Sequence, residues 1–186
     1  SGSPGVLTLE HLQDTEVQDK VGRLLKRINR SSGSSGWLKE MFVEKHDQFD
    51  AMVNYEAMII EANRELVRKG QEPMVAIYPV DGIMTADSPL GYIDHGDESK
   101  EAFFQELMAY LKSDAVQREI LGHGRRTGLV GFAKDEVDTS VFNPEWGIDI
   151  SRVISPVPTP NERVIRTALD LYQGGGLRKP SATVYV

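Results

Sequence analysis

The chain has 186 residues and no cysteine. This absence excludes disulfide frameworks, thiol nucleophiles and thiolate metal sites. Long hydrophobic runs are also missing, because no apolar stretch approaches the ~20 residues that a membrane-spanning helix needs. We therefore expect no membrane insertion by this chain. Residues 1–5, rich in glycine and serine, are typical of a linker or a cloning remnant rather than a signal peptide.

An excess of positive charge is lacking too. The chain carries 21 Lys and Arg against 28 Asp and Glu, which gives a net charge of −7 and a pI near 5.1. Nucleic acids and anionic membrane surfaces bind clustered Lys and Arg, so this balance argues against both partners. The short basic groups at Lys26, Arg27 and Arg30, and at Arg125 and Arg126, are typical of solvated helix ends and loops.

Motifs of catalysis and of metal or cofactor binding are absent as well. No nucleophile elbow of the form G-x-S-x-G occurs, and the glycine-serine segment lacks the lysine that a phosphate-binding loop requires. The four histidines show no H-E-x-x-H spacing. They are His11, His46, His95 and His123. We interpret the chain as not an enzyme, with no cofactor and no metal site.

What is present suits a globular domain, since 40% of residues are hydrophobic and 26% are charged. The best pair of strands runs from Met74 to Tyr78 and, after a turn at Asp81 and Gly82, on to Ile93. Amphipathic helices surround this pair. The pattern predicts an α/β fold in which helices pack on a small mixed sheet.

Helical periodicity predicts six helices. The first is capped by Asp14 or Thr15 and reaches Ile28, and the second starts at Trp37. The third runs from about Asp47 to Lys69 and ends at Gly70. The fourth, capped by Asp97 or Ser99, runs from about Lys100 to Lys112, and the fifth from Ser113 or Asp114 to Leu121. The last runs from Glu162 to Tyr172, with Thr159 as its expected N-cap. Residues 133–158 have an irregular, turn-rich pattern, and Ser181 to Val186 predicts a strand.

Two local features allow alternative interpretations. The segment Ser31 to Gly36 precedes the Trp37 helix, with Ser34 or Ser35 as N-cap, and free amides and hydroxyls at a helix start favour a polar or anionic ligand. A capped loop without a ligand is the competing interpretation. Tyr55 and Glu56 interrupt an apolar helix face, so they either pack with the carboxylate in solvent or face a cleft.

Several stretches together resemble a known family. They are SSGSSGW at Ser31 to Trp37, NYE at Asn54 to Glu56, AIYPVDG at Ala76 to Gly82, ADSPLG at Ala86 to Gly91, and HGRRTG at His123 to Gly128. This combination resembles the later half of bacterial extracellular solute-binding proteins of the type II periplasmic-binding-protein fold. It is most similar to the subgroup in which this module precedes a von Willebrand factor A domain.

The resemblance implies two α/β lobes that close over a solute, with part of one lobe missing at the N-terminus. It implies a solute-binding domain over residues 6–132, an irregular segment at 133–158, and a helix and strand at 159–186 leading to the A domain. The ligand-binding residues that it implies are Ser31, Ser32, Ser34, Ser35, Gly36, Tyr55, Glu56, Tyr78 and Asp81.

The function that the resemblance implies is non-catalytic binding of a small polar or anionic solute. The protein would lie outside the cell or in the cell envelope. The alternative is an interaction or spacer module that supports the adjacent A domain, reaches protein partners through it, and binds no small molecule. A cleft lined by the serine segment favours the first function, and an exposed serine segment favours the second.

Overall fold

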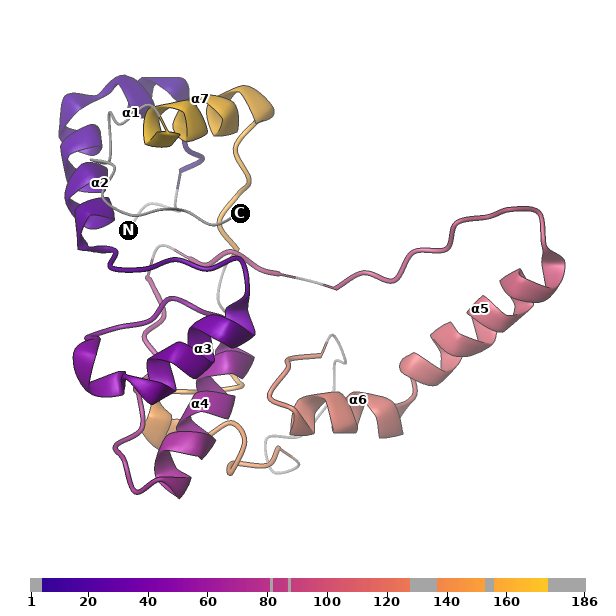
Figure 1. Ribbon diagram of the computed structural model, residues 1–186. Helices are drawn as coiled ribbons and strands as arrows, with labels where there is room; N and C mark the ends of the chain where they lie inside the picture. Colours follow the sequence, from indigo (N-terminus) through magenta and orange to yellow (C-terminus); the bar gives the residue numbers. More distant parts are fainter. Residues whose placement is uncertain (1–4, 81, 87, 128–136, 153–155, 174–186) are drawn as a thin grey trace. The chain divides into compact units, whose positions relative to one another are not determined.

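A computed structural model describes residues 5–80, 82–86, 88–127, 137–152 and 156–173. These residues are mainly helical (Figure 1). The helices are α1 (Leu9–Gln13), α2 (Thr15–Arg27), α3 (Ser35–Glu44), α4 (Glu56–Arg68), α5 (Glu98–Leu111), α6 (Asp114–Gly122) and α7 (Glu162–Gln173), with short 3-10 turns η1 (His46–Gln48) and η3 (Pro144–Trp146).

The predicted α/β fold is wrong. The described residues contain no sheet, only an isolated parallel bridge between Ile83 and Pro156. Residues 74–77 alternate between half-buried and exposed, as a strand would. However, the backbone N–H and C=O of Met74 are both bonded to the side-chain amide of Asn63, and the Ala76 N–H donates to the carbonyl of Trp146. The strand partner that the sequence implied is therefore replaced by a side chain and a loop carbonyl.

The chain divides into two compact units, each assembled from separate stretches of sequence. The first unit comprises Ser1–Leu38, Tyr78–Thr85 and Ile154–Val186. The second comprises Lys39–Ile77 and Ala86–Val153.

In the first unit, α1 packs against both α2 and α7 (Figure 1). Asp14 caps α2, as predicted, by accepting hydrogen bonds from the Glu16 and Val17 amides at 2.8 and 3.3 Å. The cap of α7 is not Thr159 but Asn161, whose Oδ1 accepts from the Val164 amide at 3.0 Å. Since an Asx side chain beside the first turn satisfies a free N–H, Asn161 fulfils the role expected of Thr159.

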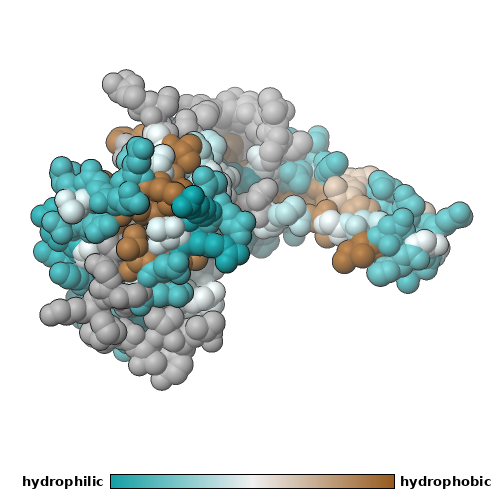
Figure 2. All heavy atoms as spheres, turned by 90° about the horizontal axis from the view of Figure 1, so that it is seen from above, coloured by the Kyte–Doolittle hydropathy of each residue, from teal (hydrophilic) through white to brown (hydrophobic). Residues whose placement is uncertain are grey.

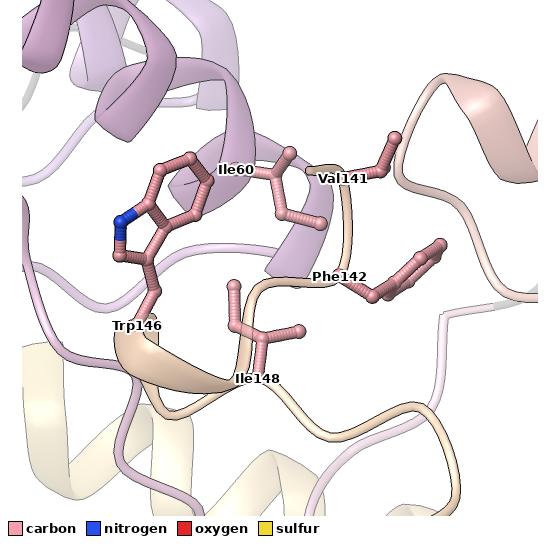
Figure 3. Close-up of a cluster of buried hydrophobic side chains, with 5 residues drawn as sticks. All are labelled: Ile60, Val141, Phe142, Trp146 and Ile148. Atoms are coloured by element: carbon pink, nitrogen blue, oxygen red, sulfur yellow. The ribbon is translucent and has the colours of Figure 1, made fainter. Parts of the chain in front are cut away.

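The second unit has α4 at its centre. One face of α4 contributes Ile60 to a buried cluster with residues of the 141–148 loop, which Figure 3 shows. The members of this cluster are Ile60, Val141, Phe142, Trp146 and Ile148. A second cluster joins α4 to α3 and consists of Val43, Ala62 and Leu66, with Met74 packed against it. Together the two clusters bury Ile60, Ala62 and Leu66 of α4.

The helix predicted from Asp47 to Lys69 starts later than expected. Residues 49–55 are not helical, and α4 begins only at Glu56. Phe49 stacks on Phe42 of α3 with ring centroids 6.1 Å apart, and the Asn54 side chain accepts from the Tyr55 amide at 2.8 Å. Such local side-chain bonding competes with helix formation. The predicted end is confirmed, because Gly70 follows the helix with a φ of 69°.

Asp97 and Ser113 occupy the N-cap positions of α5 and α6, in agreement with two of the predicted caps, although the Ser113 side chain makes no capping hydrogen bond. The Asp97 carboxylate accepts from the Ser99 and Lys100 amides at 3.1 and 3.2 Å. None of the residues of α5 is buried. Among the helices that the structure describes, none combines the length and the apolar character needed to cross a membrane.

Gly147 provides a test of the packing in the second unit. Its φ is 74°, and a Cβ there would lie 2.7 Å from the Ala76 carbonyl oxygen. Gly147→Ala should therefore lower the free energy of unfolding by about 2 kcal/mol, from the left-handed backbone and the steric clash together. Chemical denaturation measures the loss. Gly91→Ala is the matched control, since a Cβ at Gly91 meets nothing within 4 Å. Equal stability of the two variants would contradict this packing.

Candidate functional site

The serine segment caps α3. The Ser34 Oγ accepts from the Trp37 amide at 3.2 Å, and the Ser32 Oγ accepts from the Ser34 amide at 3.0 Å. Ser31 and Ser34 are exposed, whereas Ser32, Ser35 and Gly36 are half-buried. Of the two predicted caps, Ser34 is the one observed. At least two of the amides expected to hold a ligand are thus already satisfied by neighbouring hydroxyls.

Glu56, at the start of α4, is engaged by Arg126. The guanidinium donates to both carboxylate oxygens of Glu56 at 2.7 and 2.9 Å. It also donates to the backbone carbonyls of Asp149, Ile150 and Arg152, at 2.8, 3.0 and 3.0 Å. All five N–H donors of an arginine side chain are used. Glu56 therefore forms an ion pair with Arg126, which neither of its two interpretations included. Arg126, expected to be a solvated loop residue, makes these specific contacts instead.

The remaining predicted residues are dispersed. Tyr55 precedes α4 with 55% of its surface exposed, Tyr78 is half-buried, and Asp81 lies outside the described residues. The serine segment and Tyr78 belong to the first unit, while Tyr55 and Glu56 belong to the second. The predicted set therefore does not form one site within either unit.

A groove in the second unit was not predicted. Arg64, Val67 and Arg68 of α4 line it together with Trp146 of η3, and its volume is about 350 Å³. Residues spaced i, i+3 and i+4 share one face of a helix, which explains why the three α4 side chains meet there. Val67 is 52% exposed, whereas Trp146 is only 8% exposed. The groove thus has a fixed aromatic wall and a solvent-accessible apolar wall.

Trp146 is held firmly in this position. Its carbonyl accepts from the Ala76 amide at 2.7 Å, its own amide donates to the Asn143 carbonyl at 3.0 Å, and its ring packs against the buried cluster. The indole nitrogen lies on the side of the ring away from Val141 and Phe142 (Figure 3). The indole N–H is not among the buried side-chain groups that lack a partner in the described residues.

Two arginine side chains, Arg64 and Arg68, line the groove, and the surface they present to it is almost entirely apolar. The Arg68 Nε donates to the Arg64 backbone carbonyl at 3.2 Å. Arg64 affects the pKa of the Asp138 carboxylate. Its pKa is lowered first by the Ser140 hydroxyl, which donates to its carboxylate, then by the Ser140 amide, and also by the positive charge of Arg64. Arg64 and Arg68 therefore contribute mainly the hydrocarbon part of their side chains to the groove, next to Val67 and Trp146.

Sequence reasoning assigned none of these groove residues to a binding site. The i, i+3, i+4 spacing of Arg64, Val67 and Arg68 was visible, but such a pattern also describes an ordinary solvated helix face. Trp146 lies in the segment whose pattern is irregular, so nothing indicated that it would pack beside α4. In the part of the chain that the structure describes, no group of three or more His, Asp or Glu side chains is placed to hold a metal ion.

Comparisons with protein-family models, with curated proteins and with solved structures found no match for this chain.

The cap of α3 gives one prediction. Ser34→Ala removes the acceptor of the Trp37 amide and should lower the free energy of unfolding by about 1 kcal/mol. Ser31→Ala is the control, because Ser31 is exposed and precedes the cap. Urea denaturation followed by circular dichroism measures both. A Ser34→Ala variant as stable as Ser31→Ala would show that the hydroxyl does not cap the helix.

The hydrogen bonds and the charge that act on Asp138 give a second prediction. Its pKa lies below the ordinary 3.8, so the stability it contributes is present above pH 3.8 and is lost as the pH falls through its folded-state pKa. Ser140→Ala should raise this pKa, and Arg64→Ala should raise it less. Carboxyl ¹³C chemical shifts across an acid titration report the midpoint. An Asp138 midpoint unmoved by Ser140→Ala would refute the hydrogen bond.

Proposed function

We propose that the chain is a non-catalytic binding module that takes a small organic anion in the groove formed by Arg64, Val67, Arg68 and Trp146. The observation that carries the proposal is that two arginine side chains line one mainly apolar concave site together with an aromatic and an aliphatic side chain. Its volume of about 350 Å³ falls within the range of small-molecule sites, about 300–1,000 Å³. The resemblance to extracellular solute-binding proteins supports the same class of function and a place in the cell envelope.

The walls and donors favour one ligand chemistry. A guanidinium binds a carboxylate or phosphate through two parallel hydrogen bonds, which an ammonium does not do. The apolar walls of Val67 and Trp146 favour a flat hydrocarbon body beside the acidic group. An aromatic or short aliphatic carboxylate meets these requirements. A sugar or an amino-acid zwitterion meets fewer of them.

The groove is open, so binding should be weak. Charge-assisted hydrogen bonds contribute about 1.5–3 kcal/mol each, and part of that is offset by lost motion of the ligand. We expect a Kd of about 1 mM for benzoate, the simplest probe of this class.

Benzoate titration followed by amide chemical shifts tests the proposal. Shifts should saturate at α4 and around Trp146, and Arg64→Ala with Arg68→Ala should weaken binding by about tenfold or more, because both cationic donors are lost. Arg163→Ala, an exposed arginine of α7, is the matched control and should leave the affinity unchanged. Acetate, phosphate, glycine and glucose in parallel separate the contribution of charge from that of the apolar walls.

The same titration compares this groove with the serine segment. If Ser34→Ala with Ser35→Ala weakens benzoate binding and the double arginine variant does not, the solute belongs to the serine segment and the groove assignment is wrong. Absence of saturable shifts with every probe would contradict solute binding in the groove altogether.

A second function is favoured by a separate observation. On α5, Phe103 and Tyr110 are 66% and 63% exposed, and exposed aromatic side chains on one helix face are typical of protein interfaces. An interaction or spacer module that supports an adjacent von Willebrand factor A domain would use such a face and would need no solute. Saturable stabilisation by a solute favours the first function, and silence across the panel favours the second.

A further inference from the structure

The face of α5 is apolar and bordered by acids. Phe103 and Tyr110 are seven residues apart and so lie on the same side of the helix, next to the half-buried side chains of Phe104, Leu107, Met108 and Leu111. Apolar spheres are exposed among hydrophilic ones over α5 (Figure 2, right). By helical geometry Glu101 and Glu106 flank this apolar face on its two sides, and Lys100, paired with Asp97 at 3.4 Å, lies at its N-terminal end. We refer to the face and its acidic border as the α5 face.

The face of α2 has the opposite charge. Val21, Leu24 and Ile28 of this segment are 36%, 66% and 41% exposed. Five basic residues accompany them, and no Asp or Glu occurs between residues 20 and 39. The basic residues are Lys20, Arg23, Lys26, Arg27 and Arg30. This basic run stands out in a chain whose net charge is −7. We refer to it, with its apolar residues, as the α2 face.

We propose that the two faces bind each other between two copies of the chain, the α2 face of one copy against the α5 face of the other. Each face has exposed apolar side chains to bury, and the acidic border of one complements the basic run of the other. Every copy carries both faces, so in the proposed dimer the contact forms twice, with each face of one copy against the opposite face of the other. The proposal specifies a partner for the interaction function and does not depend on solute binding.

An anionic membrane is the competing occupant of the α2 face. Basic amphipathic helices bind such surfaces, but the chain as a whole is acidic, and a membrane would leave the α5 face exposed. A second copy covers both faces at once. Lipid binding by the α2 face is therefore an outcome that the experiment below is able to reveal.

Charge reversal in trans tests the pairing. Wild-type protein, measured by sedimentation velocity over a range of concentrations, should shift from monomer to dimer. Arg23→Glu with Arg27→Glu places acids on both faces, and Glu101→Lys with Glu106→Lys places bases on both. Each variant alone should associate about tenfold or more weakly than wild type, and a high salt concentration should weaken the wild-type dimer. Mixing the two variants in equal amounts should restore the dimer, because each reversed face then meets its complement.

Controls make the result specific. Arg163→Glu makes the charge more negative, as the α2-face variant does, and Glu72→Lys makes it more positive, as the α5-face variant does. Both positions are exposed and lie outside the two faces, so these variants should leave the dimer intact. Far-UV circular dichroism confirms that α2 and α5 remain helical in each variant.

Three results would overturn the proposal. One is a wild type that stays monomeric at every concentration. Another is a dimer that neither charge reversal weakens. The third is wild type that binds vesicles of anionic phospholipid through Arg23 and Arg27 but does not self-associate. A monomeric wild type that still binds benzoate overturns only the pairing, whereas a dimer that no solute stabilises overturns only the solute-binding function.

Discussion

The second unit depends on two hydrogen bonds made by one buried side chain. Asn63 is fully buried on α4, and its amide donates to the Met74 carbonyl and accepts from the Met74 amide, both at 2.8 Å. A buried backbone group without a partner costs about 1–3 kcal/mol, so these two bonds permit the chain to enter the core without a neighbouring strand. Two residues further on, the Ala76 amide finds the Trp146 carbonyl at 2.7 Å. Helix α4 thereby holds residues 74–76 in place, and these residues in turn hold the 141–148 loop.

The groove follows from this arrangement. Because the Trp146 carbonyl is bound by residue 76 and its ring packs on Ile60, the indole is placed beside the face of α4 that carries Arg64 and Arg68. A second tie secures the loop further along, where Arg126 joins Glu56 at the start of α4 to three carbonyls of residues 149–152. Both ties use α4 as the rigid element, and a site built on such an element keeps its donors in place.

The sequence predicted the local structure well and the tertiary structure poorly. Asp14, Ser34, Asp97 and Gly70 were identified as helix boundaries because capping depends on residues a few positions apart. The α/β fold was predicted from the apolar run Met74 to Tyr78 and the turn residues after it, and in the structure residues 74–77 alternate between half-buried and exposed. What the pattern could not reveal was that an asparagine side chain, eleven residues away, replaces the missing strand.

The site was missed for the same reason. Glu56 was interpreted as a cleft or solvent residue because its partner Arg126 lies 70 residues away, and no spacing rule connects them. The resemblance to solute-binding proteins directed attention to the serine segment, whose hydroxyls cap α3. The groove depends on Trp146 from an irregular segment. In each case the deciding contact is between residues far apart in sequence.

Amide hydrogen exchange under native conditions tests the central claim, that Asn63 and the Trp146 carbonyl hold residues 74–76 against α4. The account predicts that the amides of Met74 and Ala76 are protected to nearly the same free energy as the amide of Leu66 within α4, while the Val75 amide between them exchanges much faster. Exchange of Met74 and Ala76 at the rate of Val75 would contradict it.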